Sequence, residues 1–218
     1  MYLSRVKLDV EKRDTMRALA QPNLIHGAVE QGFRGERGRN IWRIDFLNNY
    51  CYLLVLSQEK PNFTHLVEQF GFSNSEPLWE TKNYDLLLER LKEGQIWRFR
   101  LCANPTRSSF TEKCKKTGRG KIFAHVTTEQ QKEWLLKRAG TSGFLLEESG
   151  FDVVHSQWKR FRKGGGGRVT LKIVTFEGIL TISNVELFKR ALLTGIGRAK
   201  SYGCGMLTIA GCGGVKSA

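Results

Sequence analysis

The sequence lacks the features that identify several common classes of protein. No stretch approaches the roughly 18 consecutive apolar residues of a membrane-spanning helix, and the start, MYLSRVKLDV, lacks the apolar region of a signal peptide. The five cysteines are odd in number, and no CxxC pair stands beside a matching His or Cys pair. We therefore expect a cytoplasmic protein with no membrane partner, reduced thiols and no zinc site. We expect Cys51 and Cys102 to be buried as small apolar side chains.

Acidic residues are scarce relative to basic ones. The chain has 21 Asp and Glu against 35 Lys and Arg, a net charge of +14 and an isoelectric point near 9.8. This balance is typical of proteins that bind polyanions, so nucleic acid is the leading partner. A membrane surface, or solubility alone, is also compatible with it. The length of 218 residues suits one or two domains with a substantial core.

The first 92 residues predict the order strand, helix, strand, strand, helix, strand. Val6, Leu8 and Val10 alternate with charged residues as in a half-buried strand, and Pro22 opens a helix. Strands follow at 41–47, with Trp42, Ile44 and Phe46 on one face, and at 51–57. A second helix after Pro61 ends at Gly71, and a short strand covers 79–84. This order is the ferredoxin-like arrangement.

Residues 93–218 repeat the pattern with longer elements. A short helix in 85–94 ends at Gly94, and a strand covers 97–103. The segment 127–140 begins with Thr caps and ends with Gly, as helices do. Two long strands flank KGGGG, a helix begins with a capping box from Ser183 to Glu186 and ends before Gly195, and MLTIA forms the last strand. We therefore predict an α+β fold of two tandem ferredoxin-like (βαββαβ) domains, residues 1–92 and 93–218.

Four histidines are candidates for chemistry near neutral pH. With about 100° per helical residue, His26 points away from the apolar stripe of Ile25, Ala28 and Val29. This orientation fits a catalytic histidine and fits an ordinary exposed one equally well. His65, His125 and His155 have no partner pattern, so we expect no chemical role for them. No HExxH or similar spacing occurs, so no metal is predicted.

The strongest local charge feature is WKRFRKGGGGR, residues 158–168. A hairpin tip there would carry five cations with aromatic residues between them: Lys159, Arg160, Arg162, Lys163 and Arg168. Such a hairpin could follow nucleic-acid phosphates, and the alternative is a solvated, disordered loop. A second basic run, Lys113 to Lys121, could also contact phosphate.

The segment GIGRAKSYGCG packs four glycines into residues 195–205: Gly195, Gly197, Gly203 and Gly205. It follows a helix and precedes a strand, which is the reverse of the order in dinucleotide-binding and P-loop sites, and it lacks the GK[ST] ending. Glycines cluster where φ is positive or where backbone is approached closely, although a chain end that never orders would look similar. We predict a loop whose amides, with Arg198, Lys200 and Ser201, cradle a nucleic-acid backbone.

Five segments together resemble one family, the CRISPR RNA-processing endoribonucleases of the CasE type. The segments are MYLSRVKL, NLIHGAV, RFRLCANPT, TFEGILTI and GIGRAKSYGCGMLTIA, which run from residue 1 to about 210. The family belongs to the repeat-associated mysterious protein superfamily and to the type I-E Cascade complex. The resemblance implies two tandem ferredoxin-like domains, with the glycine-rich loop packed between them near the RNA.

The resemblance also implies an activity. Such enzymes use no cofactor or metal and cut the repeat RNA at the 3′ base of its stem-loop, leaving 5′-OH and 2′,3′-cyclic phosphate ends. The helix-borne histidine of the family falls on His26, which would transfer a proton. Family members carry a tyrosine three residues earlier, where this chain has Asn23; Tyr2, Ser201 and Tyr202 are candidates to replace it.

The family's basic hairpin, which enters a groove of the RNA stem, maps onto Lys159 to Arg168. The resemblance further implies that the enzyme keeps its product and joins other Cascade subunits, chiefly the backbone subunit adjoining the 3′ end of the guide. Two alternatives remain: a non-catalytic subunit that binds the stem-loop, and an unrelated basic two-domain protein that binds structured RNA.

Overall fold

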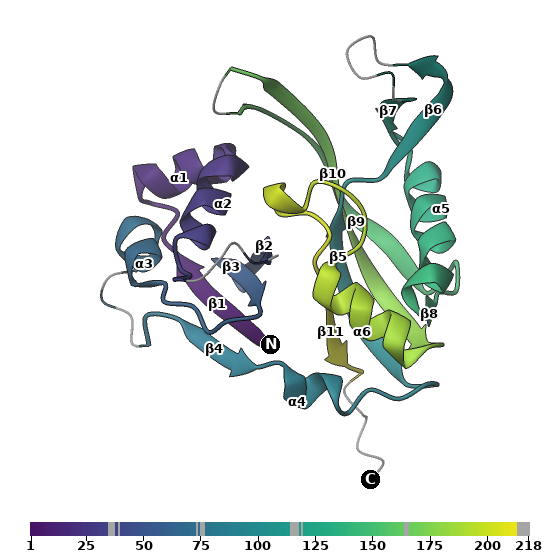
Figure 1. The fold of residues 1–218 in the computed structure, drawn as a ribbon, viewed down its shortest axis with the longest axis horizontal. Coiled ribbons are helices and arrows are strands. Elements are labelled where there is room, and N and C mark those ends of the chain that lie inside the picture. Colours follow the sequence, from purple (N-terminus) through teal and green to yellow (C-terminus); the bar gives the residue numbers. More distant parts are fainter. Residues whose placement is uncertain are drawn as a thin grey trace.

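The computed structural model describes residues 1–34, 38, 40–72, 74, 77–113, 118, 120–163 and 166–212. They form two ferredoxin-like halves that lie side by side (Figure 1). Each half is an antiparallel sheet with helices packed on one face, so the predicted α+β fold of two tandem ferredoxin-like units is confirmed. Within the described part of the chain, no helix is long and apolar enough to span a membrane.

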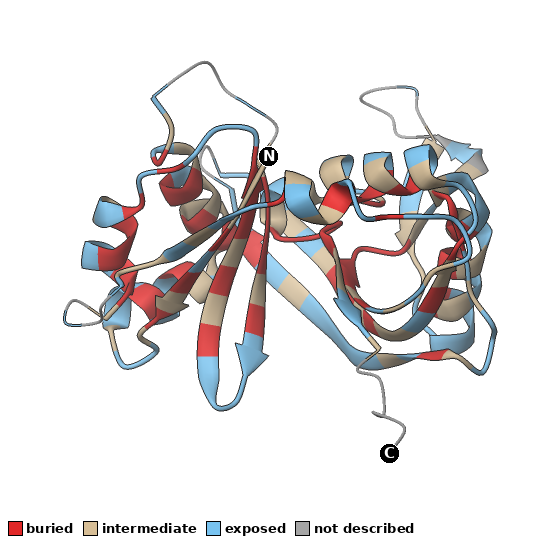
Figure 2. Cartoon of the chain, turned by 90° about the horizontal axis from the view of Figure 1, so that it is seen from below, coloured by how far each residue is buried: buried red, intermediate tan, exposed pale blue. Residues whose placement is uncertain are grey.

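The first half contains a four-stranded sheet in the order β2-β3-β1-β4. Its elements are β1 (Tyr2–Leu8), α1 (Arg13–Ala20), α2 (Pro22–Glu30), β2 (Ile41–Leu47), β3 (Tyr50–Ser57), α3 (Thr64–Phe70) and β4 (Glu80–Asn83). Apolar residues of α1, α2 and α3 pack with those of the central strands into one core. Buried residues lie on the inner faces of these helices and along the central strands (Figure 2).

Two features of the first half differ from the sequence prediction. The helix α1 was not expected, because it buries only Thr15 and Ala18 and therefore has a weak apolar stripe. The first strand ends at Leu8, and Val10 is 41% exposed.

Trp42, Ile44 and Phe46 share one face of β2, as predicted, and line the same cleft. The burial of the two faces was not anticipated: Phe46 is 67% exposed, whereas the polar residues Arg43 and Asp45 on the other face are buried. Alternation alone could not reveal this, because the second half of the chain covers the polar face of β2.

The second half contains a five-stranded sheet with the path β11-β5-β10-β8, and β9 pairs with β10. Its elements are β5 (Ile96–Ala103), β6 (Thr106–Lys113), β7 (Gly120–Ala124), α5 (Thr128–Ala139), β8 (Phe144–Leu145), β9 (Phe151–Arg162), β10 (Arg168–Ile182), α6 (Val185–Thr194) and β11 (Leu207–Gly211). Two short 3-10 helices complete it, η1 (Gly140–Ser142) and η2 (Lys200–Tyr202). Both the β6–β7 hairpin and the β9–β10 ribbon project from the same end of the molecule (Figure 1).

The predicted N-cap of α5 is confirmed, and the predicted N-cap of α6 is wrong. At α5, Thr127 and Gln130 form the predicted capping box. At α6, the predicted box from Ser183 to Glu186 is wrong. The N-cap is Asn184, whose Oδ1 accepts a hydrogen bond from the backbone N–H of Leu187 at 2.9 Å. Both residue types suit an N-cap, so the sequence pattern did not distinguish between them.

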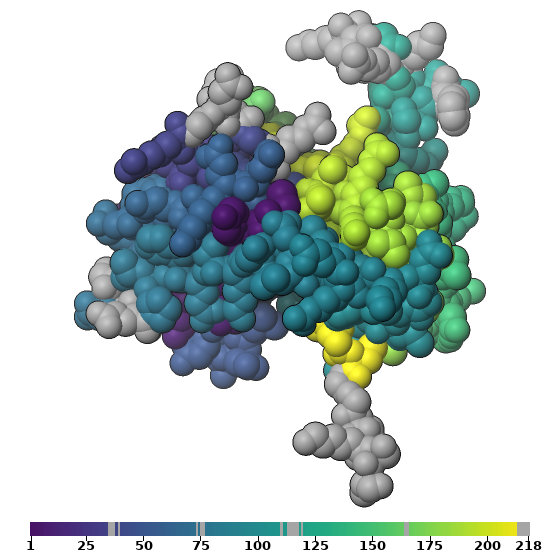
Figure 3. All heavy atoms as spheres, turned by 60° about the horizontal axis from the view of Figure 1, so that its bottom comes forward, coloured from purple at the N-terminus to yellow at the C-terminus, as the bar shows by residue number. Residues whose placement is uncertain are grey.

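The two halves share a continuous core. Ile41 and Leu56 of the first sheet belong to the same buried cluster as Phe99 and Leu101 of the second. The connecting segment, which includes the helix α4 (Asp85–Leu88), crosses the join between the halves (Figure 3). The predicted boundary at residues 92 and 93 falls within this connection, between β4 and β5, and stays a prediction.

A buried arginine, Arg43, links the two halves by hydrogen bonds. All five N–H donors of the Arg43 guanidinium are used: two bind Asp45, at 2.8 and 2.6 Å. The other three bind the second half, at the carbonyl oxygens of Arg100 and Met206 and at Oγ1 of Thr208. Because Arg43 is 2% exposed, each of these bonds forms away from water, where an unpaired charge would be costly.

Candidate functional site

His26 lies on the side of α2 that faces away from the core. Its side chain is 35% exposed, whereas Ile25, Ala28 and Val29 are buried in the core of the first half. The helix begins at Pro22, whose fixed φ and missing N–H suit the first helical position. The predicted orientation of His26 is therefore confirmed.

The two ring nitrogens of His26 have different surroundings. Nδ1 is buried without a hydrogen-bond partner and lies 3.9 Å from Oε1 of Glu30, one turn further along α2. The same Oε1 accepts a hydrogen bond from Nδ2 of Asn40 at 3.4 Å, which holds the carboxylate beside the ring. Nε2 forms no hydrogen bond with any described residue, and, unlike Nδ1, it is not buried. The ring therefore presents Nε2 to solvent, with a carboxylate behind it.

Glu30 was missed as part of the site. The signal was available, because residues four apart on a helix are neighbours. Asn23, one turn before His26, has a buried Oδ1 that bonds to no described residue. An amide oxygen accepts hydrogen bonds and does not exchange protons near neutral pH. This position therefore offers an acceptor near His26 rather than the phenol of the family.

The glycine-rich loop, residues 195–205, brings the end of the chain to α2. Its helix η2 lies against α2 and β2 (Figure 1). Ser201 and Tyr202 belong to η2, whereas Tyr2 lies on β1 between β3 and β4. Of the three candidates to replace the tyrosine, the fold therefore brings two to the helix that carries His26.

The four glycines of this loop have φ values of 72°, 86°, 80° and 94°. A Cβ at Gly203 would lie 2.7 Å from the ring of Trp42, and one at Gly195 would lie 2.8 Å from the carbonyl oxygen of Gly205. Positive φ and close approach thus coincide, as glycine alone permits. The loop is closely packed between the halves, and it is not an unordered chain end.

The predicted basic hairpin forms the end of the β9–β10 ribbon. Four of its five predicted cations are exposed: Arg160, Arg162, Lys163 and Arg168. Arg162 pairs directly with Arg168 across the two strands. Like charges placed opposite one another destabilise a strand pair unless an anion neutralises them. Two residues between them, 164 and 165, lie outside the described residues.

The arginines of the ribbon share one face. Oγ of Ser156 on β9 donates to Oε1 of Gln131 on α5 at 3.4 Å. Because side chains alternate along a strand, Arg160 and Arg162 lie on the same face of β9 as Ser156. The arginines therefore lie on the face of the ribbon opposite to the one that carries Lys159.

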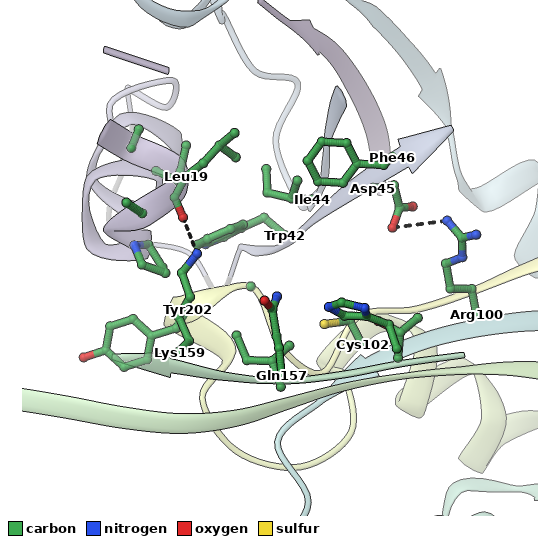
Figure 4. A pocket seen from close by; sticks show the side chains of 18 of the residues that line it. Leu19, Trp42, Ile44, Asp45, Phe46, Arg100, Cys102, Gln157, Lys159 and Tyr202 are labelled. Carbon is green, nitrogen blue, oxygen red and sulfur yellow. Dashed lines mark hydrogen bonds and ion pairs between the residues drawn. The ribbon is translucent and has the colours of Figure 1, made fainter. Parts of the chain in front are cut away.

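Lys159 lies on the opposite face of the ribbon. Its Nζ donates to the carbonyl oxygen of Leu19, at the end of α1, at 2.6 Å (Figure 4). Burial lowers the pKa of this ammonium. The next residue on that face, Phe161, packs edge-on against Tyr202, with ring centroids 5.0 Å apart. Lys159 thus joins the ribbon to the first half, and its contact with phosphate stays a prediction.

A cleft of about 680 Å³ lies between this face of the ribbon and the first half. Apolar side chains of β2 form one wall, opposite Gln157 and Lys159 of β9, and Arg100 pairs with Asp45 at one end at 3.5 Å (Figure 4). Ile25 of α2 lines the cleft. Because the next helical residue points about 100° away, His26 faces a different direction.

The second basic run, 113–121, connects β6 to β7, and most of it lies outside the described residues. Lys121 pairs with Glu112 at 3.0 Å. The remaining site predictions, Arg198, Lys200 and Ser201, are on the glycine-rich loop, where Arg198 and Ser201 are exposed. Their contacts with a nucleic-acid backbone stay predictions.

One other histidine and two cysteines occupy structural positions. Nε2 of His65 hydrogen-bonds the carbonyl oxygen of Ala28 at 2.8 Å and so ties α3 to α2. Cys51 and Cys102 are buried as predicted, and burial, followed by the charge of Asp45, raises the pKa of Cys51 to about 11. In the described part of the chain, no three His, Cys, Asp or Glu side chains gather to hold a metal ion.

Comparison with known proteins identifies what this geometry resembles. A model of the family described as "CRISPR associated protein" matches residues 1–211. The CRISPR-associated endoribonuclease Cse3 of Thermus thermophilus is 28% identical, over 96% of this chain and 100% of its own. The Cascade subunit CasE of Escherichia coli is 29% identical, over 73% of this chain and 74% of its own. A solved structure of Cse3 bound to a 19-nucleotide RNA superimposes with a TM-score of 0.77 at 25% identity, covering 96% of this chain and 100% of that one.

Proposed function

Because this chain belongs to the family of CRISPR-associated proteins, we propose that it is a metal-independent endoribonuclease that cleaves CRISPR precursor RNA at the 3′ base of the repeat stem-loop. The Thermus thermophilus relative is named an endoribonuclease, and a solved structure of Cse3 contains RNA. The similarity to that relative covers both halves of the chain, so no part of the proposed machinery lacks a counterpart region. The proposal includes the cytoplasmic location expected from the sequence.

The observation that supports this function best is the position of His26. Its Nε2 is exposed on α2, and α2 lies against the loop that carries Lys200 and Ser201. A proton-transferring ring and backbone-binding groups therefore stand on adjoining elements from opposite ends of the chain. Adjacent placement of a titrating group and phosphate-binding groups is what RNA cleavage at one bond requires.

In the proposed reaction, the 2′ oxygen of the upstream nucleotide attacks the adjacent phosphorus, and the bond from phosphorus to the 5′ oxygen breaks. The 2′ hydroxyl loses one proton and the leaving 5′ oxygen gains one. The products carry a 2′,3′-cyclic phosphate and a 5′-OH. Nε2 of His26 makes one of the two transfers, which contributes about 10² to 10⁴ in rate. When the ring carries both protons, Glu30 faces it at 3.9 Å.

RNA binding falls mainly to the second half of the chain. The exposed arginines of the ribbon fit a double-stranded stem, whose shape, phosphates and 2′-OH groups are the main features that proteins recognise. The like-charged pair of Arg162 and Arg168 becomes favourable once a phosphate lies between the guanidinium groups.

Because the Escherichia coli relative is named a Cascade subunit, we propose that this chain also stays on its product within such an assembly. Its neighbour there would be the backbone subunit that adjoins the 3′ end of the guide. Retention of the product predicts single-turnover kinetics, with a burst equal to the enzyme concentration.

The test is cleavage of a repeat RNA from the same genome in the presence of EDTA. Wild type is compared with His26→Ala and with His155→Ala, which removes an exposed histidine of β9 as a matched control. Cleaved ends are scored for 2′,3′-cyclic phosphate. We expect wild type and His155→Ala to cut and His26→Ala to bind without cutting.

Two other outcomes contradict the proposal. If neither wild type nor His26→Ala cuts while both bind the stem-loop tightly, the protein is a non-catalytic guide-binding subunit. If unrelated hairpins compete equally with the repeat, it is a general binder of structured RNA.

A further inference from the structure

A small pocket lies where three elements of the second half meet: the start of β6, the helix α5 and the glycine-rich loop. Its volume is about 180 Å³. Its lining residues are Thr106, Ser108, Ile122, Trp134, Arg138, Gly197 and Arg198. The pocket lies apart from the cleft of Figure 4, which is lined mainly by the first half and by β9 and β10.

One buried donor of this pocket has no partner in the part of the chain that the structure describes. Nε1 of Trp134 is buried and has no hydrogen-bond partner among the described residues, although the side chain is only 3% exposed. A buried N–H left without an acceptor costs about as much as a lost hydrogen bond. The ring atoms Cζ2 and Cη2 of Trp134 face Gly197, where a Cβ would lie 3.0 and 3.1 Å from them. The unpartnered N–H is two bonds from Cζ2, on a ring that lines the pocket.

The pocket is positively charged, because Arg138 and Arg198 both line it. The guanidinium of Arg138 stacks 4.1 Å above the ring of Trp134 and donates one hydrogen bond to the backbone oxygen of that residue. No described carboxylate pairs with Arg138 or with Arg198. The neighbouring Glu133 pairs with Lys137 instead. A half-buried guanidinium such as that of Arg138 and an exposed one such as that of Arg198 can both bind an anion when no carboxylate occupies them.

The positive charge of Arg138 also affects a nearby histidine, His125. The pKa of His125 is lowered, first by burial and then by the positive charges of Arg107 and Arg138. The pocket thus combines two guanidinium groups, two hydroxyls and a buried N–H, all of them donors, in a space large enough for one small anion. Phosphate has the acceptor oxygens that match such a set.

We infer that this pocket binds one backbone phosphate of the RNA, close to the bond that is cut. The inference rests on the proposed function for the identity of the polyanion. Gly197 lines the pocket, and Ser201, four residues later, lies in η2 against α2. Four residues span at most about 14 Å, so the bound phosphate belongs to a nucleotide near the one that reaches His26. The pocket therefore fixes which nucleotide of the RNA lies at the imidazole of His26.

The first test changes the charge of the pocket. Arg138→Gln is compared with Arg90→Gln, which removes an exposed arginine next to α4 as a matched control. Affinity for the repeat stem-loop is measured across a series of salt concentrations, together with the position of cleavage. We expect Arg138→Gln to weaken binding about tenfold and to reduce the salt slope by about 0.7 to 0.9, while Arg90→Gln matches wild type.

The second test observes the unpartnered N–H directly. The indole signal of Trp134 is identified in a ¹H–¹⁵N spectrum by its loss in Trp134→Phe, which retains the aromatic stacking on Phe176. Stem-loop RNA and inorganic phosphate are added in separate titrations. We expect the signal to shift with RNA as a hydrogen bond forms, and to shift with phosphate only at much higher concentration.

The outcomes separate this inference from the proposed function. If wild type cleaves the repeat while Arg138→Gln binds with unchanged affinity and salt slope and the indole signal stays still, the pocket is not a phosphate site and the proposed function stands. If phosphate shifts the signal and RNA does not, the ligand is a free phosphate and the RNA assignment is wrong. If wild type binds no RNA, the proposed function fails, and the phosphate titration alone decides whether the pocket binds this anion.

Discussion

The two ferredoxin-like halves share an architecture and differ in charge. Residues 1–92 hold 13 Lys and Arg against 12 Asp and Glu, whereas residues 93–218 hold 22 against 9. The nearly neutral half carries His26, and the basic half carries the ribbon, the glycine-rich loop and the pocket beside Trp134. Under the proposed function, the same fold carries a proton-transferring ring in one copy and a polyanion-binding surface in the other, because function depends on the side chains placed on the fold.

The halves also differ in how their helices are held. The N-cap residues of α1, α2 and α3 make no side-chain capping hydrogen bond, whereas α5 and α6 are capped by Thr127 and Asn184. The helices of the first half therefore depend on packing against their sheet and against the second half. A change at the join should disturb the His26 helix more than a change within the second half.

The largest expected effect separates catalysis, which we assign to the first half, from RNA binding, which we assign to the second. We expect His26→Gln to lower the rate of cleavage by about 10² to 10⁴, because Gln cannot exchange a proton near neutral pH. Affinity for the stem-loop should not change, since the basic half supplies it. Single-turnover rates and equilibrium binding measure the two quantities separately. A comparable loss in affinity would show that the first half also binds the RNA.

The join between the halves should be the most sensitive place for stability. Arg43→Ala removes both hydrogen bonds to the buried Asp45 and leaves it only the longer pair with Arg100, at 3.5 Å. We therefore expect a loss of about 3–5 kcal/mol in the free energy of unfolding. The matched control, Arg5→Ala, breaks an ion pair with Glu80 that is nearly half exposed on each side, and should cost at most about 1 kcal/mol. Urea denaturation measures both. Equal effects would mean that the buried network contributes nothing beyond a surface pair.

Gly203 tests whether the glycine-rich loop is fixed by packing as well as by conformation. Gly203→Ala combines an unfavourable positive φ with a methyl group 2.7 Å from Trp42, so we expect a loss of about 2–4 kcal/mol. Gly94→Ala has the same sign of φ and open space around it, and should cost about 1 kcal/mol. Thermal or urea unfolding compares them. Similar losses would show that contact with the first half is unimportant for the loop.

Substitutions in the β9–β10 ribbon test whether its positive charge contributes to RNA binding. Arg160→Ala and Arg162→Ala should each weaken stem-loop binding and reduce the magnitude of the salt slope by about one. Cleavage of the bound RNA should continue at the wild-type rate, because these residues lie on the half that binds. Binding titrations at several salt concentrations provide the slope. An unchanged slope in both variants would remove the ribbon from the RNA interface.

The smallest expected effect concerns helix capping. Asn184→Ala removes the acceptor for the N–H of Leu187 and should cost about 1 kcal/mol. Ser183→Ala should have almost no effect, because Ser183 is not the N-cap in this structure. Both are measured by denaturant unfolding. A larger loss from Ser183→Ala would restore the capping box that the sequence pattern indicated.

Much of the fold could be predicted because its signals are local. The capping box at Thr127, the glycine that ends α6 and the alternation along β9 and β10 each depend on residues a few positions apart. The orientation of His26 likewise follows from helical spacing. Helix α1 escaped prediction because its buried face contains only Thr15 and Ala18, so too few apolar residues marked the period.

By itself the sequence determined the two ferredoxin-like units, the exposed histidine of α2 and the excess of positive charge, because periodicity, capping and composition are properties of neighbouring residues. Only the tertiary structure decided that the polar face of β2 is buried, that Lys159 binds Leu19 and that Trp134, Arg138 and Arg198 enclose one pocket. The physical reason is distance along the chain. Arg43 is stable when buried because it meets carbonyl oxygens 57 and 163 residues away, and no local pattern records where such partners will lie.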